Sequence, residues 1–519
     1  MLNARFLEAI APHKPSSSNA LLILYDQLNL AVFPQELLAQ KPILLFIESF
    51  AYATAIPHHK QKLVYILSSQ RHFAIDCSQK GFVVLPLFTT GDHSDAVEKY
   101  LSENPDIHLT YMIPSEWDVR TKMEALKMRF SGRIQAIANN FFIADIPKFT
   151  PKIKKGYRQE TFYRDLRQST GYLMDGKKPI GGSWNYDKEN RKNLPKTQKI
   201  PTLSKLEHDP ITQEVINLVE TFLPNNFGAI ANFNYAVTRE QAMILAQLFI
   251  LERLPNYGAY EDAIKLDEPF LFHSVLSAYL NNGLLLPREL CEMAIAAYES
   301  EEAPLNSVEG FIRQILGWRE FIHVYYEAMM PEIKASNHFN FTYNLPQLYW
   351  DADTDLLCLK DAISNVINYS YSHHIQRLMV LSNFSNLTFT NPQDLNRWFY
   401  MAYIDAYEWV ELPNVIGMST FADGGILASK PYVSGGNYIN KMSNYCSQCK
   451  YDVKQKTGER ACPFNYLYWN FVDIHRQDFT ENGRVSMMTN MFEGKSDDEK
   501  AEIRTLSQTL IQNLNRANY

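Results

Sequence analysis

The sequence predicts an α/β domain built on a doubly wound parallel sheet, a long linker and a C-terminal all-α domain. Three observations along the chain predict this order. Short apolar runs alternate with helical patterns over residues 20–135, which is typical of strands joined by crossover helices. Proline, glycine and lysine are frequent from 136 to 215, and helical periodicity dominates from 216 onward. We therefore expect an α/β domain at 1–135, a linker at 136–215 and a helical domain at 216–519.

Each expected element has its own signal in the sequence. The expected strands are the short apolar runs ALLILY (20–25), PILLFIESF (42–50), GFVVLPLF (81–88) and IHLTYMI (107–113). Helical patterns between them, such as the one at 58–80, indicate parallel strands. No G-x-G-x-x-G follows the first run, so the sheet carries no dinucleotide fingerprint. In the helical domain the clearest helical patterns cover residues 238–254, 306–329, 359–384 and 394–412.

The composition indicates a globular protein. The chain of 519 residues is 46% apolar and 21% charged, which is far from the composition of a disordered chain. Its N-terminus lacks the order of a secretory signal, and its first apolar run is too short to cross a bilayer. We expect a soluble cytoplasmic monomer that has no membrane partner.

The net charge of −7 conceals a basic segment. Between Lys148 and Lys199 the chain has ten Lys and four Arg against three Asp and two Glu, a local net charge of +9. An excess of this size can neutralise several phosphates of a nucleic acid. The alternative is a solvated linker without a binding role.

Three of the six cysteines are close together near the C-terminus. Cys446 and Cys449 form C-x-x-C, and Cys462 follows after twelve further residues, directly before Pro463. In a reducing cytosol, clustered thiolates ligate metal more often than they form disulfides. Cys358 can complete a set of four around zinc or a 4Fe-4S cluster. We favour the 4Fe-4S cluster because one of its ligands would come from a distant helix.

The order of the domains, together with these cysteines, resembles the photolyase and cryptochrome superfamily. The similar branch is that of the iron-sulfur bacterial cryptochromes and photolyases, the prokaryotic (6-4) photolyases. The matching stretches are GGSWNYDKENRKNLP (181–195), PLNSVEGFIRQILGWREF (304–321), SYSHHIQRLMV (370–380), residues 405–449 and ACPFNYLYW (461–469). The resemblance implies a photolyase fold, FAD in the helical domain, and a lyase that uses blue light to split (6-4) photoproducts in UV-damaged DNA. It also implies that Cys358, Cys446, Cys449 and Cys462 hold the 4Fe-4S cluster.

The resemblance also implies which residues surround the flavin. Those implied for FAD binding are His273, Ser274, Leu276, Ser277, Arg377, Asp405 and Asn414. Those implied for catalysis are His374, with His373 beside it, and Tyr432, which is similar to a residue that contacts the lesion. A protonated imidazole suits the hydroxyl transfer of this repair, because its pKa lies near neutrality. On a helix the two adjacent histidines point about 100° apart, so only one can face the flavin.

The same resemblance implies an electron relay at Trp398 and Trp350. Phe399 stands where a redox-active tyrosine is found in the family, and phenylalanine is not readily oxidised. We therefore expect the route to pass through Tyr400 or Trp409. The alternative is that these aromatic side chains are ordinary core residues.

Two further sites follow from the resemblance. For DNA it implies Trp184, Asp187 and Arg191, with Mg2+ held at Asp187. For an antenna, 6,7-dimethyl-8-ribityllumazine, it implies Glu48, His58, His59 and Lys60. Tyr52 and Ala55 replace a carboxylate and a tyrosine that are typical of the family's antenna site, so we expect weaker or different antenna binding.

Two alternative functions stay open on the sequence. One is a cryptochrome-type blue-light photoreceptor that does not repair DNA. The other is a light-independent nucleic-acid-binding protein whose iron-sulfur cluster is structural. The visible spectrum separates them, because only the second predicts a protein without flavin.

Overall fold

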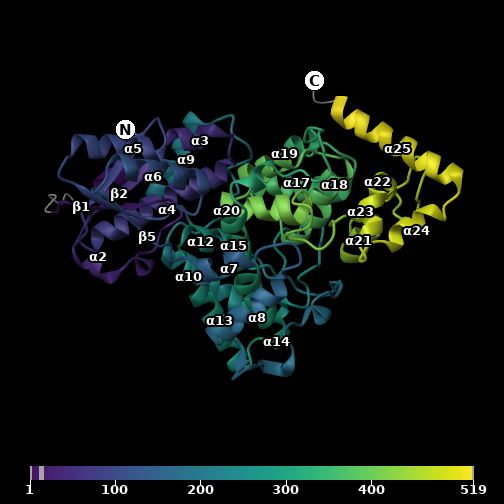
Figure 1. Ribbon diagram of the computed structural model, residues 1–519, viewed down its shortest axis with the longest axis horizontal. Coiled ribbons are helices and arrows are strands. Elements are labelled where there is room, and N and C mark those ends of the chain that lie inside the picture. The colour runs from purple at the N-terminus through teal and green to yellow at the C-terminus, as the bar shows by residue number, and fades with distance from the viewer. Residues whose placement is uncertain (1–2, 11–16, 517–519) are drawn as a thin grey trace.

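The computed structural model describes residues 3–10 and 17–516. Figure 1 shows the α/β domain (purple to blue) at one end, the last helices (yellow) at the other, and the remaining helices (teal to green) between and below them. No helix in the described part of the chain is long and apolar enough to cross a membrane.

The N-terminal domain contains a five-stranded parallel sheet in the order β3–β2–β1–β4–β5. The strands are β1 (Asn19–Ile23), β2 (Ile43–Ser49), β3 (Val84–Thr89), β4 (His108–Met112) and β5 (Ile134–Ile137). The four expected strands and their parallel pairing are confirmed. The fifth strand is a short addition at the edge of the sheet, beside β4.

Helices cover both faces of this sheet. Leu21 and Ile23 of β1 belong to the core that contains helix α4 (Lys60–Gln79), whereas Leu22 belongs to the core of helices α5 (His93–Glu103) and α6 (Trp117–Arg129). This alternation follows from the period of two in a strand. The strand order reverses between β1 and β4, and such a reversal is where open parallel sheets bind ligands, at the carboxyl ends of the strands.

The segment at 136–215 is more regular than the sequence suggested. It contains α7 (Ile146–Phe149), α8 (Gln159–Thr170) and the start of α9 (Pro210–Phe222). Helix α8 forms because Phe162, Tyr163 and Leu166 bury one face of it, a spacing that creates an apolar stripe. Helix α9 packs against α4 of the α/β domain. The frequent lysines and prolines of this segment indicated a linker, so its short amphipathic helices were not predicted.

The regular structure after residue 222 is helical, and some of the connecting loops are long, such as the one between Met442 and Pro463. These helices are α10 (Arg239–Leu248), α11 (Leu254–Tyr257), α12 (Ser277–Asn282), α13 (Pro287–Glu299), α14 (Leu305–Ile312), α15 (Glu320–Met329), α16 (Leu348–Asp351), α17 (Leu357–Tyr369), α18 (Asn383–Leu387), α19 (Pro392–Ala402), α20 (Glu408–Leu412), α21 (Gly436–Met442), α22 (Pro463–Ile474), α23 (Arg476–Glu481), α24 (Met487–Glu493) and α25 (Asp497–Arg516). Nearer the N-terminus the described residues also form the short helices α1 (Ala4–Ala9), α2 (Gln35–Ala39) and α3 (Phe50–Ala55).

Several of these helices contain π-helical segments. Three of these segments matter here. Segment η6 (Arg313–Arg319) continues α14, and η9 (Pro413–Ser419) continues α20. Segment η8 (Gln376–Ser382) continues the helical turn that begins at His374. Segments of this kind are frequent at functional sites because they widen a helix and redirect its side chains. All three contribute side chains to one cavity.

One apolar core joins the α/β domain to the helical domain. It extends from Leu21 of β1 to side chains such as Leu290 and Ala422 in the helical domain. Polar contacts reinforce the join, because Arg120 of α6 pairs with Glu327 of α15 at 2.6 Å. The carboxylate of Glu320 accepts the backbone N–H groups of Ile143 and Ala144 at 2.6 and 2.8 Å. A second core lies around α17, α22 and α25.

Candidate functional site

A cavity of about 280 Å³ lies within the helical domain. Side chains from the start of α12, from η6, from η8 and from α20 with η9 line it. Six of the seven residues expected at a flavin line this cavity: His273, Ser274, Ser277, Arg377, Asp405 and Asn414. The seventh, Leu276, is 1% exposed and does not line it. The structure thus brings together residues that lie far apart in the sequence.

A buried ion pair organises the floor of the cavity. Both guanidinium NH groups of Arg377 contact the carboxylate of Asp405 at 3.1 Å, and the hydroxyl of Ser277 donates to the same carboxylate at 2.6 Å. Burial alone would raise the pKa of Asp405, but the charge and hydrogen bonds of Arg377 and Ser277 outweigh it and lower that pKa. Asp405 is therefore a fixed anion that faces the cavity.

Asn414 is held in one orientation on the opposite wall. Its side-chain oxygen accepts the indole N–H of Trp318 at 2.9 Å, and its amide donates to the carbonyl of Val410 at 2.7 Å. Trp318 lies within the matched stretch 304–321, so its position was available in the sequence, but its role as a partner of Asn414 was not. A fixed polar group of this kind tunes the electronics of a ring placed beside it.

The two adjacent histidines point to different surroundings, but not by the rotation expected within a helix, because His373 precedes the helical segment that begins at His374. His374 lines the cavity, whereas His373 is buried and its ring stacks on His273 with centroids 4.6 Å apart. The pair lies at the start of a helical segment rather than in the middle of one. Partial desolvation by the surrounding protein and the nearby Arg377 charge lower the pKa of His374 to about 4, although its side chain is exposed where it lines the cavity. In the protein without DNA its imidazole is therefore neutral near pH 7.

Two of the residues expected to contact DNA form ion pairs within the chain. Asp187 forms an ion pair with Arg313, and Arg191 lies 3.7 Å from Asp262. The guanidinium groups of Arg164 and Arg167 lie 5.4 and 5.5 Å from the ring of Trp184. Tyr432 does not line the flavin cavity. Burial raises the pKa of Tyr432, against the opposing charges of Arg484 and Arg191, so these cations are its neighbours.

The four aromatic residues expected in electron transfer have different surroundings. Trp398 is fully buried, and its ring lies 5.2 Å from that of Tyr349, the chain neighbour of the exposed Trp350. Tyr400 donates to Glu116 at 3.1 Å, at the interface with the α/β domain. Trp409 packs on Phe142 with centroids 4.9 Å apart. The structure therefore leads Tyr400 and Trp409 away from Trp398.

The four expected cluster ligands converge. The thiol of Cys358 on α17 is electrostatically coupled to those of Cys446, Cys449 and Cys462. Burial and these neighbouring thiols raise the pKa of Cys358 well above its usual value. Within residues 3–10 and 17–516 no group of three or more His, Cys, Asp or Glu could hold a metal ion. The sulfurs are thus not gathered as tightly as the ligands of a single ion.

The residues expected at the antenna do not share one cavity. A cavity of about 910 Å³ lies beyond β2 and β3, and of the four it is lined only by Glu48, whose carboxylate is held by Arg71 at 2.7 Å. His58 and His59 are buried, and the ring of His59 bonds the carbonyl of Ile367 in the helical domain. Lys60 begins α4. The hydroxyl of Tyr52 is buried without a hydrogen-bond partner in the described residues.

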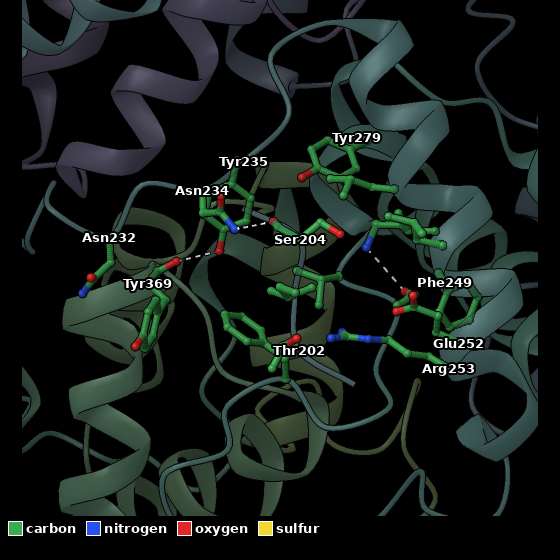
Figure 2. Close-up of a pocket in the computed structure, with 17 residues that line it drawn as sticks. Thr202, Ser204, Asn232, Asn234, Tyr235, Phe249, Glu252, Arg253, Tyr279 and Tyr369 are labelled. Atoms are coloured by element: carbon green, nitrogen blue, oxygen red, sulfur yellow. Dashed lines mark hydrogen bonds between the residues drawn. The ribbon is translucent and has the colours of Figure 1, made fainter. Parts of the chain in front are cut away.

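Figure 2 shows a smaller cavity of about 110 Å³. It adjoins the cavity of about 280 Å³, because Ser274 and Val275 line both. Leu276 lines the smaller cavity, as does Arg253, which the sequence did not single out. Arg253 is 3% exposed and donates to the carbonyls of His273 and Pro201 at 3.2 and 2.9 Å. It holds the Ser274 turn from behind. No motif marks it, because its partners are backbone atoms.

Comparisons with known proteins find similarity over nearly the whole chain. The family described as "Deoxyribodipyrimidine photo-lyase-related protein" matches residues 21–235. The "(6-4) photolyase" of Agrobacterium fabrum is 39% identical over 507 residues, which is 96% of this chain and all of that protein. A class III photolyase from Agrobacterium tumefaciens has the same fold, with a TM-score of 0.57 at 13% identity over 97% of this chain and 99% of the other. An archaeal photolyase from Sulfolobus tokodaii, described with two FAD molecules, has a TM-score of 0.55 at 12% identity over 95% of this chain and all of that chain.

Proposed function

This chain belongs to the family of photolyase-related proteins that includes the Agrobacterium fabrum (6-4) photolyase, and from that premise we propose that it is a light-driven DNA repair enzyme. Its substrate would be the pyrimidine (6-4) pyrimidone photoproduct in UV-damaged DNA. The observation that carries the proposal is the cavity in which the Arg377–Asp405 pair, Asn414 and His374 meet. The full-length similarity supports the same conclusion.

FAD is the cofactor that this cavity fits. Ser274 presents its hydroxyl group just before α12, where the diphosphate would lie, whereas the hydroxyl of Ser277 is engaged with Asp405. Asp405 and Asn414 would face the ring system, with Arg377 beside them. When bound and reduced, the flavin supplies one electron to the lesion after absorbing blue light. The protein's part is to hold the ring, exclude water and return a proton.

His374 is the residue that we propose for proton transfer. It lines the cavity, whereas His373 lies behind it against His273. Repair moves a hydroxyl from one base to the other, and an imidazolium can donate the proton that this step needs. The phosphate of an extruded nucleotide would raise the pKa of His374 from its low value, since an anion favours the charged imidazole. We propose no separate catalytic role for His373.

The basic segment at 148–199 supports DNA binding. Arg164 on helix α8 is exposed and lies over the ring of Trp184 in the segment after it, near the cavity-lining π-helical segment η6 on which α8 packs. Arg167 is buried beneath them and donates to the carbonyl of Trp184 at 3.2 Å, so it positions this surface from below. We propose that this segment contacts phosphates and that Tyr432, beside Arg191 and Arg484, stacks on splayed bases. Asp187 is already neutralised by Arg313, so the residues present do not fit Mg2+, and no Mg2+ enters the proposal.

The four cysteines fit a 4Fe-4S cluster, and the antenna residues do not fit a lumazine. Four neighbouring thiols, of which those of Cys358 and Cys462 are buried, form an all-sulfur donor set that suits iron-sulfur chemistry. A multi-iron cluster also holds its ligands farther apart than one ion does. Glu48 is bound by Arg71, and His59 by a backbone carbonyl, so their polar groups are not free for a ribityllumazine. The antenna is therefore left out of the proposal.

The decisive experiment follows repair directly. An oligonucleotide with one (6-4) photoproduct would be incubated with protein whose FAD has been reduced chemically, under blue light or in the dark. We expect restoration only in the light, and a His374→Asn variant that keeps its FAD but loses repair. A His338→Asn variant is the matched control, since His338 lies at the surface against Asp478. No repair by protein that carries reduced FAD would leave the photoreceptor alternative.

A further inference from the structure

The electron route to the flavin cavity runs past a residue that cannot be oxidised. Phe399 lines the cavity and Trp398 lies behind it, with ring centroids 5.2 Å apart. We propose that Tyr403 replaces Phe399 as the redox relay between Trp398 and the flavin. This inference rests on the flavin site of the proposed function.

Tyr403 lies closer to the cavity than Trp398 does, judged by its contacts. Its ring stacks on Phe399 with centroids 5.1 Å apart and an interplanar angle of 13°. The guanidinium of Arg377 lies 4.1 Å from the ring, and the phenol shares a hydrogen bond of 2.7 Å with the hydroxyl of Ser372. Phe399, Arg377 and Ser372 all line the cavity.

The ring of Tyr403 also contacts the ring of Trp398. The edge of one ring meets the face of the other, with centroids 5.8 Å apart and an angle of 83°. Trp398 in turn contacts Tyr349, and the next residue, Trp350, is 38% exposed. The rings of Tyr349, Trp398 and Tyr403 thus form a series of contacts that ends beside the cavity, with Tyr403 as its innermost oxidisable member. The exposed Trp350 adjoins this series through the chain at Tyr349, while its own ring packs on Phe227.

Tyr400 and Trp409, the two relay residues expected from the sequence, lie away from the route through Trp398 and Tyr403. Tyr400 bonds Glu116 and packs on His58, toward the α/β domain. Trp409 packs on Phe142 and His323. Neither ring contacts Trp398 or Tyr403 in the described residues, so neither lies on this route.

The proposed step balances as follows. One electron passes from Tyr403 to the photoexcited oxidised flavin, and the phenol proton moves to Ser372, whose own hydroxyl proton passes to water in the cavity. Arg377 favours this proton loss, because a positive charge beside the ring opposes a tyrosine cation. An electron from Trp398 and a returning proton then restore Tyr403. An external thiol, which is oxidised to a disulfide, reduces the tryptophan cation through Trp350.

The test is the rate of flavin photoreduction by a thiol, followed by the loss of flavin absorbance. We expect a Tyr403→Phe variant with normal FAD content to be slower by about tenfold or more. Adding Phe399→Tyr to this variant should restore the rate, since the new hydroxyl would enter the cavity. A Tyr407→Phe variant is the matched control: Tyr407 is equally buried, and its hydroxyl has no hydrogen-bond partner in the described residues.

Two further readouts identify the relay itself. Transient absorption should show a neutral tyrosyl radical in the wild type and none in Tyr403→Phe, and deuterated water should slow only the wild type. Wild-type rates in Tyr403→Phe, with loss of photoreduction in Trp398→Phe, would overturn the proposal, because Trp398 would then donate directly. This outcome is separate from the proposed function, which fails if the chemically reduced wild-type enzyme does not repair the lesion.

Discussion

At the residue scale, the pairing of Arg377 with Asp405 determines what the cavity can bind. Both side chains are largely buried, with exposed fractions of 20% and 10%. Each charge neutralises the other. The hydroxyl of Ser277 donates to Asp405, and the Nε–H of Arg377 donates to the backbone carbonyl of Ser372. A buried ion pair of this kind contributes little net stability, but removing one partner leaves an unpaired buried charge.

We therefore expect Arg377→Met to lower the free energy of unfolding by about 3 kcal/mol. Urea denaturation of the protein without flavin measures this directly. Arg129→Met removes an exposed partner of Glu98 and should cost less than about 1 kcal/mol. Equal effects of the two substitutions would show that the Arg377 pair is not buried in solution.

The low pKa of His374 predicts the pH dependence of repair. Partial desolvation and Arg377 hold this pKa at about 4, so the protonated fraction rises as the pH falls toward that value. If His374 donates a proton, the repair rate with prereduced flavin should increase between about pH 8 and about pH 6. His374→Gln should repair slowly and without this slope. A wild-type rate that is flat over this range would exclude His374 as the proton donor.

At the scale of elements, the cysteines connect α17 with the loop before α22. Cys358 lies in the first turn of α17 and Cys462 directly precedes α22. Both helices belong to the second core, around which α25 also packs. A cluster held between them would restrain the unfolded chain as other crosslinks do.

We expect the anaerobically purified protein to contain about four iron atoms per chain. Cys358→Ser should lose most of this iron and unfold at a lower temperature, because α17 would no longer be tied to α22. Cys77→Ser changes a buried thiol in the α/β core and should keep the iron. Iron analysis with thermal unfolding measures both effects, and full iron in Cys358→Ser would remove this residue from the ligand set.

At the scale of the whole molecule, the shared apolar core makes the two domains interdependent. Side chains from β1, α4, α9, α13 and α15 pack in one cluster, and the Arg120–Glu327 pair and Glu320 join the same surfaces. Removing the helical domain would expose the apolar face of α4. Exposed apolar area of that size opposes independent folding.

Thermal unfolding should therefore show one cooperative transition that includes both domains. A fragment that ends after β5, at residue 137, should lack the near-ultraviolet signal of packed aromatic side chains. Calorimetry of the full chain and circular dichroism of the fragment check these outcomes. Two separated calorimetric peaks would mean that the interface contributes little.

Much of the fold and part of the site could be predicted from the sequence. The short apolar runs predicted the strands, and the helical patterns between them indicated parallel pairing. The C-x-x-C motif and Cys462 indicated a thiolate site. The resemblance to the photolyase family located most of the residues that line the candidate flavin cavity, because the motifs that carry it are local and need no knowledge of distant contacts.

Only the tertiary structure decided which side chains meet. Tyr403, Ser372 and Arg253 act through partners that are distant in sequence or belong to the backbone, so no spacing reveals them. Tyr400 and Trp409 satisfied the pattern of a relay, yet packing directs them elsewhere. Periodicity determines the face of an element that is buried, whereas contacts between elements depend on how those faces fit together in three dimensions.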